Sequence, residues 1–390
     1  MSKGALGLLS AYWPEDTPRY AHIPLKTVGD VTVYPLAESA GDRTALLGAS
    51  GSLTYRDLSK RALQFGAALR GRVQRGGRVA IALSDAAQMI VAAFGAFEAD
   101  ALAFVSDRMP AAEVLRAFGA DLVIADPGAA AENVVGFDDL MAGEGKEKSG
   151  RPDFRSPILA LAMPGGRGEA LHNHRSLAAT AISVGKFYLL AEEITVLMLE
   201  PPTSWCTLAV MLGALQRGAT IVAGWEPRRP ALPEKIDYAV CGWDRANALL
   251  DDEVGATLAG RIAAGLIVSI EGAFSTSRRR RFARLLKTDV LTALGRNDLG
   301  PVVASHPAWF LNDAAGIPLP NVDLRPLNPA DGTPLNIGWE VVDSAEIGVK
   351  SALAPAGGTL VEGWLRSGTI AQIDPTGLYF LLAEHGLRSA

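Results

Sequence analysis

The stretch AGIPLPNVDLRPLNPADG, residues 315–332, decides the fold of this chain, together with EIGV at 346–349 and EGWLRSGTIAQIDPTGLYFLL at 362–382. Beyond Gly316 the helical period of apolar residues disappears, and prolines interrupt short runs in which apolar and polar residues alternate. Such runs are typical of short strands separated by turns. The sequence therefore predicts a small β-rich, barrel-like subdomain over residues 316–390.

Upstream of this tail, helical and strand patterns alternate. An amphipathic helix is expected at 53–69, an apolar strand at 79–83, and further strands after a polar, glycine-rich connection that runs from 127 to 157. Strands separated by helices of about ten to fifteen residues indicate mostly parallel sheets covered by helices. We therefore expect an α/β fold with two parallel-rich sheets layered with helices, divided into a first sheet subdomain at 1–155, a second at 156–315 and the β-rich subdomain at 316–390.

Composition excludes several classes of protein. The chain has 390 residues, of which 49% are hydrophobic and 20% charged, as in globular proteins rather than disordered ones. Its net charge of −5 argues against a nucleic acid or an anionic membrane as partner, because both reward a positive field. Cys206 and Cys241 belong to no CxxC pair, so we expect buried, reduced thiols in a cytoplasmic protein.

The quoted tail resembles the closing part of the large domain of the adenylate-forming enzymes, the acyl-CoA synthetases, aryl-acid ligases and luciferases. Two earlier phrases resemble the same family in order: DRTALLGASGSLTYRDLSKRALQFGAALR at 42–70 and GGRVAIAL at 76–83. The resemblance implies the family's fold, and it leads us to expect that the usual mobile C-terminal domain is lacking. Fold alone does not fix function, so the chemical positions decide.

The family's phosphate loop, YTSGTTGxPKG, corresponds here to residues 158–174, a segment without serine or threonine. Gly165, Gly166 and Gly168 keep the backbone freedom of that loop and Arg167 keeps a positive charge, whereas Glu169 places a carboxylate where a phosphate would lie. Two interpretations remain open: a structural turn, or a weakened cradle for an anion. Either way, we expect only weak binding of ATP, AMP and magnesium.

Two further motifs have changed. The YGxTE phrase corresponds to residues 294–298, where Asn297 and Asp298 keep polar groups that would meet a nucleotide phosphate or, equally, cap neighbouring turns. Asp298 is the one candidate magnesium ligand, relevant only if ATP binds. The TGD phrase corresponds to residues 367–369, and Thr369 cannot replace the aspartate that accepts both ribose hydroxyls.

The family's acyl-site phrase, PLFHxxG, corresponds to residues 200–206 and has lost its histidine. A tryptophan stands nearby and either lines an apolar slot for an aryl or acyl group or is an ordinary packed core residue. The candidates for this pocket are Trp205, Leu294 and Arg296. Gly272, Ala273 and Gly295 could line the same slot and are also candidates for the nucleotide site, with the residues named above.

Two remaining patterns have plain structural interpretations. His172 and His174 form an H-x-H pair without a third ligand nearby, while Asn173 between them is expected to cap the following helix. The basic run at 277–287 contains an apolar stripe of Phe282, Leu285 and Leu286, which indicates a solvated helix packed on the sheet. Docking of this helix to an acidic partner protein is the alternative.

Two functions follow from these observations. The first is a homologue of the acyl- or aryl-adenylate-forming ligases that has lost most or all catalysis, has no catalytic residue we can assign, and serves as a scaffold for a small carboxylate or a partner protein, including a second copy of itself. The alternative is a working AMP-forming carboxylate ligase whose closing domain is supplied in trans. The missing hydroxyls, lysine and ribose aspartate together favour the first.

Overall fold

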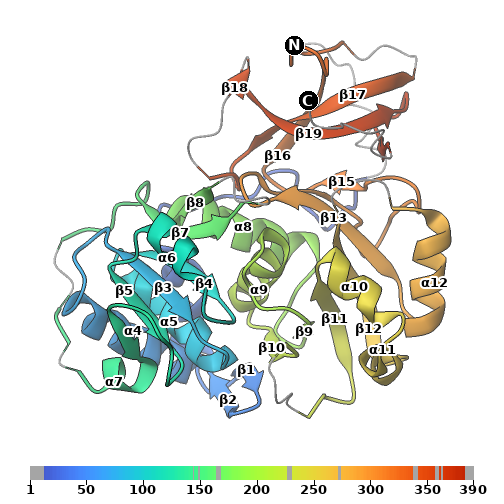
Figure 1. The fold of residues 1–390 in the computed structure, drawn as a ribbon. Coiled ribbons are helices and arrows are strands. Elements are labelled where there is room, and N and C mark those ends of the chain that lie inside the picture. Colours follow the sequence, from blue (N-terminus) through green and yellow to red (C-terminus); the bar gives the residue numbers. More distant parts are fainter. Residues whose placement is uncertain are drawn as a thin grey trace.

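The computed structural model describes residues 13–382 except 144, 148–149, 164–167, 226–230, 271–273, 337–340, 356–359 and 362. Its strands form three sheets, and helices pack between and around the first two (Figure 1). The predicted α/β fold class, two parallel-rich sheets with helical layers and a smaller β subdomain, is confirmed.

Sheet B has six strands in the order β6-β5-β3-β4-β7-β8, parallel except for the β7–β8 hairpin. The bounds are β3 (Arg78–Ala82), β4 (Leu102–Ser106), β5 (Leu122–Ala125), β6 (Val134–Gly136), β7 (Pro157–Ala162) and β8 (Glu169–Asn173). The associated helices are α4 (Tyr55–Arg70), α5 (Ala86–Glu98), α6 (Ala112–Phe118) and α7 (Phe137–Met141). Capping fixes two of these helices: Thr54 and Asp57 form a capping box on α4, and Asp85 accepts from the backbone N–H of Gln88 on α5.

Sheet A has nine strands in the order β15-β14-β13-β12-β11-β9-β10-β1-β2, parallel from β1 to β13 and antiparallel at both ends. The bounds are β1 (Thr44–Gly48), β2 (Gly51–Thr54), β9 (Thr195–Met198), β10 (Thr220–Ala223), β11 (Ile236–Cys241), β12 (Ile262–Ile270), β13 (Val290–Arg296), β14 (Gly300–Ala304) and β15 (Ile317–Pro318). The helices are α2 (Val28–Val31), α3 (Val33–Ser39), α8 (His174–Phe187), α9 (Trp205–Arg217), α10 (Trp243–Leu249), α11 (Glu253–Leu258) and α12 (Thr276–Leu286).

The central strands of sheet A are largely apolar and buried because helices cover both of their faces. Every residue of β11 is buried, and so is every residue of β13 except Arg296. Helix α8 begins at the predicted Asn173 cap, whose side chain accepts from the backbone N–H of Ser176. The cap prediction is therefore confirmed.

Sheet C is the antiparallel tail, and it lies at one end of the molecule, above sheet A in Figure 1. It contains β16 (Val322–Leu327), β17 (Val342–Ser351), β18 (Leu360–Val361), β19 (Trp364–Ile373) and β20 (Tyr379–Leu381). The strand order is β16-β17-β19-β18, and β20 pairs with β19. Its first strand begins at Val322, a few residues after the helical period disappears, and β15 between them belongs to sheet A.

The sheets exchange strands across the predicted subdomain boundary near residue 155. Strands β1 and β2 come early in the chain yet pair into sheet A through β10, whereas the β7–β8 hairpin comes after the boundary and joins sheet B through β4. The first two units therefore share their hydrophobic core.

Both cysteines are buried and free, as expected. Burial raises the pKa of the Cys206 thiol above its ordinary value, so this thiol is protonated at neutral pH. Among the described residues, no helix combines the length and the apolarity needed to cross a bilayer.

Candidate functional site

Three segments that resemble the family's nucleotide motifs meet in space, although they are far apart in sequence. They are the β7–β8 hairpin, the turn after β13, and residues 367–369 in β19. In the hairpin, Ala162 pairs with Glu169 and the N–H of Met163 donates to the carbonyl of Gly168 at 2.9 Å. Gly168 has a φ of +92°, a conformation that favours glycine. Gly165, Gly166 and Arg167 lie outside the described residues.

The side chain of Asn297 links the β7–β8 hairpin to the first residue of the helix over 205–217. Its Oδ1 accepts from the backbone N–H of Trp205 at 2.9 Å, and its Nδ2 donates to the carbonyl of Ala162 at 2.6 Å. Its own carbonyl accepts from Nε2 of His172 at 2.7 Å. Trp205 is the first residue of α9, whose N-cap Ser204 makes no side-chain cap bond, so Asn297 caps this helix from the turn after β13.

Asp298, the candidate magnesium ligand, is held by Arg296. Nε of Arg296 donates to Oδ1 at 2.9 Å and Nη2 donates to Oδ2 at 2.6 Å, a bidentate pair that engages both carboxylate oxygens. Nη1 of Arg296 also donates to the carbonyl of Ser367. The guanidinium therefore joins the turn after β13 to the counterpart of the ribose motif.

Residues 367–369, the counterpart of the ribose motif, are held by the carboxylate of Glu346 and have no aspartate of their own. Glu346 is 2% exposed, and its Oε1 accepts from the backbone N–H of Gly368 at 2.8 Å while its Oε2 accepts from Nε of Arg366 at 2.7 Å. The hydroxyl of Ser367 accepts from the N–H of Thr369 at 3.0 Å. Both Glu346 oxygens are thus used inside sheet C, and position 369 has no carboxylate to offer a sugar.

The residues proposed to line an acyl pocket are packed together. Trp205 is 9% exposed and lies against Gly295, where an added Cβ would come within 3.0 Å of the indole and 2.4 Å of the Gly300 carbonyl. Leu294 is 4% exposed. The void beside Trp205 and Cys206 has a volume of only about 10 Å³, hardly room for one water molecule. Gly272 and Ala273 lie outside the described residues.

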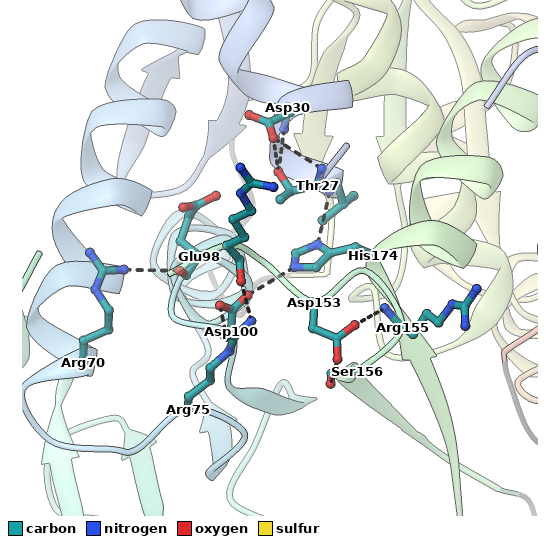
Figure 2. A network of polar contacts seen from close by, with 12 residues as sticks. Thr27, Asp30, Arg70, Arg75, Glu98, Asp100, Asp153, Arg155, Ser156 and His174 are labelled. Atoms are coloured by element: carbon teal, nitrogen blue, oxygen red, sulfur yellow. Dashed lines mark hydrogen bonds and ion pairs between the residues drawn. The ribbon is translucent and has the colours of Figure 1, made fainter. Parts of the chain in front are cut away.

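His172 and His174 point to different partners. Besides Asn297, His172 lies near the Ser176 hydroxyl at 3.5 Å, and burial lowers its pKa to about 4, so it is neutral at physiological pH. His174 is fully buried in the network of Figure 2: Nδ1 accepts from the N–H of Val28 at 3.3 Å, and Nε2 lies 3.7 Å from Oδ1 of Asp100. Within the described part of the chain, no group of three or more histidine, cysteine, aspartate or glutamate side chains could hold a metal ion.

The Arg296–Asp298 pair and the role of Glu346 were missed from the sequence. Arg296 and Asp298 are two residues apart, and only the turn between β13 and β14 brings their side chains together. Glu346 belongs to the EIGV phrase, but nothing in that phrase shows that its carboxylate would face Gly368 across β17 and β19. The first contact depends on the conformation of a local turn, and the second depends on the pairing of β17 with β19.

Residues 36–153 match the family model described as AMP-binding enzyme. None of the curated proteins matches this sequence. Among solved structures, ATP-bound MatB from Rhodopseudomonas palustris is 16% identical with a TM-score of 0.75, over 90% of this chain and 78% of that one.

Two further structures are similar over nearly the same span. The N-terminal subdomain of NpsA from Klebsiella oxytoca, in complex with 3-hydroxyanthranilyl-AMSN, is 19% identical with a TM-score of 0.76, over 92% of this chain and 99% of that one. A benzoate CoA ligase from Burkholderia xenovorans LB400 is 20% identical with a TM-score of 0.76, over 92% of this chain and 80% of that one. The chain therefore has the fold of these structures, including that of the NpsA N-terminal subdomain over nearly its whole length, as its motifs predicted.

The residues present do not fit ATP and magnesium in the way that the family motifs require. Asp298 is neutralised by Arg296, both polar groups of the Asn297 side chain are used within the protein, and residue 369 is a threonine. A magnesium ion at Asp298 would compete with a guanidinium already paired to both oxygens. We therefore derive no catalytic step through ATP.

Proposed function

We propose that this protein is a non-catalytic relative of the AMP-forming carboxylate ligases, which keeps their large-domain scaffold and uses it for binding. The observation that carries this proposal is the bond set of Arg296, which pairs with Asp298 and reaches Ser367. These contacts join the counterparts of two of the family's nucleotide motifs. A nucleotide that bound through both motifs would compete with them.

The magnitude of the loss supports the same conclusion. Removing a single group that stabilises charge in a transition state commonly costs about 3–4 kcal/mol. Here the ribose carboxylate and the hydroxyls of the phosphate loop are missing from the sequence, and the remaining carboxylate is paired. Even with strong non-additivity, little catalysis would remain.

Two kinds of ligand are compatible with this scaffold, a small carboxylate and a partner protein. A small aryl or acyl carboxylate would enter beside Trp205, where the packing leaves little space between described residues. A partner protein would contact the outer surface and needs no opening of the cleft. The closed packing around Trp205 and Gly295 therefore favours a partner protein over a small ligand.

Carboxylate-dependent exchange of labelled pyrophosphate into ATP tests the loss of catalysis. We expect no exchange with benzoate or 3-hydroxyanthranilate, under conditions in which the benzoate CoA ligase from Burkholderia xenovorans serves as the positive control. Exchange above background with either acid would overturn the proposal and would favour a working ligase. Addition of a separately expressed closing domain from a working AMP-forming ligase tests the version in which this domain acts in trans, and exchange that depends on its addition would overturn the proposal.

A further inference from the structure

Helix α12 has one buried face and one strongly basic face. Its residues Arg279, Phe282 and Leu286 are buried, spaced three and four apart, as expected for a helix that packs on a sheet. Leu285, which the sequence placed in the same stripe, is partly exposed. The exposed face carries five cations and no acidic residue: Arg278, Arg280, Arg281, Arg284 and Lys287.

Arg279 anchors the helix, and the other arginines of α12 are exposed to solvent. Arg279 is 3% exposed, donates to the carbonyl of Val290 at 2.8 Å and to the Thr292 hydroxyl at 3.0 Å, and lies between the rings of Phe274 and Phe310. This anchor fixes the rotation of α12 against β13. The side chains of the other cations consequently face solvent.

The exposed cations are largely without counter-charges. Within the part of the chain that the structure describes, only Arg281 pairs with a carboxylate, that of Asp251, at 3.4 Å and with both side chains well exposed. Arg278 stacks over the ring of Trp243, with its guanidinium carbon 4.8 Å from the ring centroid. Arg280 and Arg284, one helical turn apart, line an open hollow of about 600 Å³ together with Ala283. A surface that served only solubility would normally intersperse both signs of charge.

The extent of this face favours a protein over a nucleic acid. Eleven helical residues span about 16 Å, and the chain as a whole carries a net charge of −5. A long polyanion that leaves the helix would therefore meet a surface that is negative on balance. A compact acidic protein surface needs only the local field, and arginine is suited to carboxylates because it can bind them bidentately. Figure 1 shows α12 at the outer edge of the molecule, on the far side of sheet A from sheet B.

We propose that the exposed face of α12 is a docking surface for an acidic protein partner, with carboxylates that pair with Arg280, Arg284 and Lys287. This surface is defined by those three residues together with Arg278 and Arg281. The proposal goes beyond the non-catalytic role and does not depend on it, because α12 lies outside the nucleotide-motif contacts. The result of the pyrophosphate exchange experiment therefore does not test the docking surface, and the result of the peptide-binding experiment does not test the loss of catalysis.

Fluorescence anisotropy with a labelled peptide of twelve glutamates tests the proposal on the full chain. We expect saturable binding at 50 mM NaCl that weakens strongly at 300 mM NaCl. The triple variant Arg280→Gln, Arg284→Gln, Lys287→Gln should weaken it at least tenfold. A matched control removes three exposed cations elsewhere, Lys60→Gln, Arg61→Gln and Arg72→Gln, and should change the affinity less than threefold.

The outcomes separate the explanations. Equal losses in the two triple variants would mean that the peptide senses only net charge, and no binding at 50 mM NaCl would mean that α12 is an ordinary solvated helix; either overturns the proposal. Tighter binding of a twelve-nucleotide single-stranded DNA than of the peptide would overturn it in favour of a nucleic acid. Circular dichroism and thermal unfolding confirm that both variants are folded.

Discussion

At the scale of single residues, the structure assigns Asn297 a structural task where the family motif has a threonine. Its amide supplies one acceptor to α9 and one donor to the β7–β8 hairpin. A threonine side chain is too short to reach two partners on opposite sides in the same way. The sequence could show that the residue had changed, but not that its partners had changed with it.

Replacement of Asn297 by alanine is expected to lower the free energy of unfolding by about 1–2 kcal/mol, because the N–H of Trp205 loses its cap and the carbonyl of Ala162 loses a donor. Asn297→Asp keeps an acceptor at the N-terminus of α9 and should lose less. Urea denaturation of the three proteins measures both differences. Equal stability of Asn297→Ala and the unchanged protein would show that the two bonds contribute nothing.

His172 gives the fold a dependence on pH. Its pKa is lowered to about 4 in the folded protein, whereas the unfolded chain has the ordinary value of about 6.5. Between these values the unfolded state binds more protons, so stability falls as the pH falls. We expect this one residue to cost about 2 kcal/mol of stability between pH 7.5 and pH 5.

The variant His172→Gln isolates that contribution. The glutamine can still donate to the carbonyl of Asn297 but does not titrate, so its stability should decline less between pH 7.5 and pH 5 than that of the unchanged protein. His306, whose pKa burial also lowers to about 4, remains in both proteins and produces a common decline. Parallel stability curves for the two proteins would contradict the assignment.

At the scale of elements, α12 and the β13–β14 hairpin show what periodicity can and cannot predict. The apolar stripe located α12 correctly, since Phe282 and Leu286 are fully buried. The burial of Arg279 was not predicted, because a guanidinium is buried only where carbonyls and hydroxyls are placed to receive it. Those groups come from Val290 and Thr292 in β13 and from Ser305, the residue directly after β14.

Arg279 is therefore expected to be essential for the docking of α12. Arg279→Leu leaves the carbonyl of Val290 and the Thr292 hydroxyl without their donor and should destabilise the protein by about 1–3 kcal/mol. Arg279→Lys should not restore stability, because an ammonium cannot reproduce the planar fork that binds both partners. The exposed neighbour Arg280→Leu provides the control, with a change within about 0.5 kcal/mol in the same chemical denaturation experiment.

The β13–β14 hairpin depends on the absence of a side chain at Gly295. An added methyl group would meet the carbonyl of Gly300 at 2.4 Å, a backbone atom of the paired strand. Gly295→Ala should therefore destabilise the hairpin by about 1–3 kcal/mol. In the double variant with Trp205→Leu the indole clash is removed and the backbone clash remains, so only part of the stability should return; complete recovery would show that the indole alone sets the limit.

At the scale of the whole molecule, the alternation of strands and helices and the loss of that alternation after Gly316 were sufficient to predict three sheets of the right kind. The exchange of strands between sheets A and B was not predictable, since apolar strands such as β1 and β7 look alike in sequence whichever sheet they join. The candidate site shows the same limit. Sequence identified three motif counterparts, but it did not reveal that Arg296 and Asn297 would join those segments, or that Glu346 would bind the backbone of Gly368 inside sheet C.

The closed arrangement of these segments leads to an expectation for the intact protein in the presence of nucleotide. A ligand that binds only the folded state stabilises it by RT ln(1 + [L]/Kd), which is below about 0.4 kcal/mol at 1 mM ATP–magnesium if the dissociation constant exceeds 1 mM. For a chain of 390 residues this corresponds to a rise in Tm of less than about 1 °C.

Thermal unfolding with and without ATP–magnesium measures this rise in Tm, and MatB from Rhodopseudomonas palustris, whose structure was solved with ATP bound, is the comparison protein. Arg296→Ala removes the guanidinium that pairs with Asp298 but leaves Thr369 in place, so we expect no larger rise for this variant. A rise of several degrees that saturates with ATP in the unchanged protein would mean that the Arg296 contacts open for nucleotide, and the non-catalytic proposal would then lose its main support.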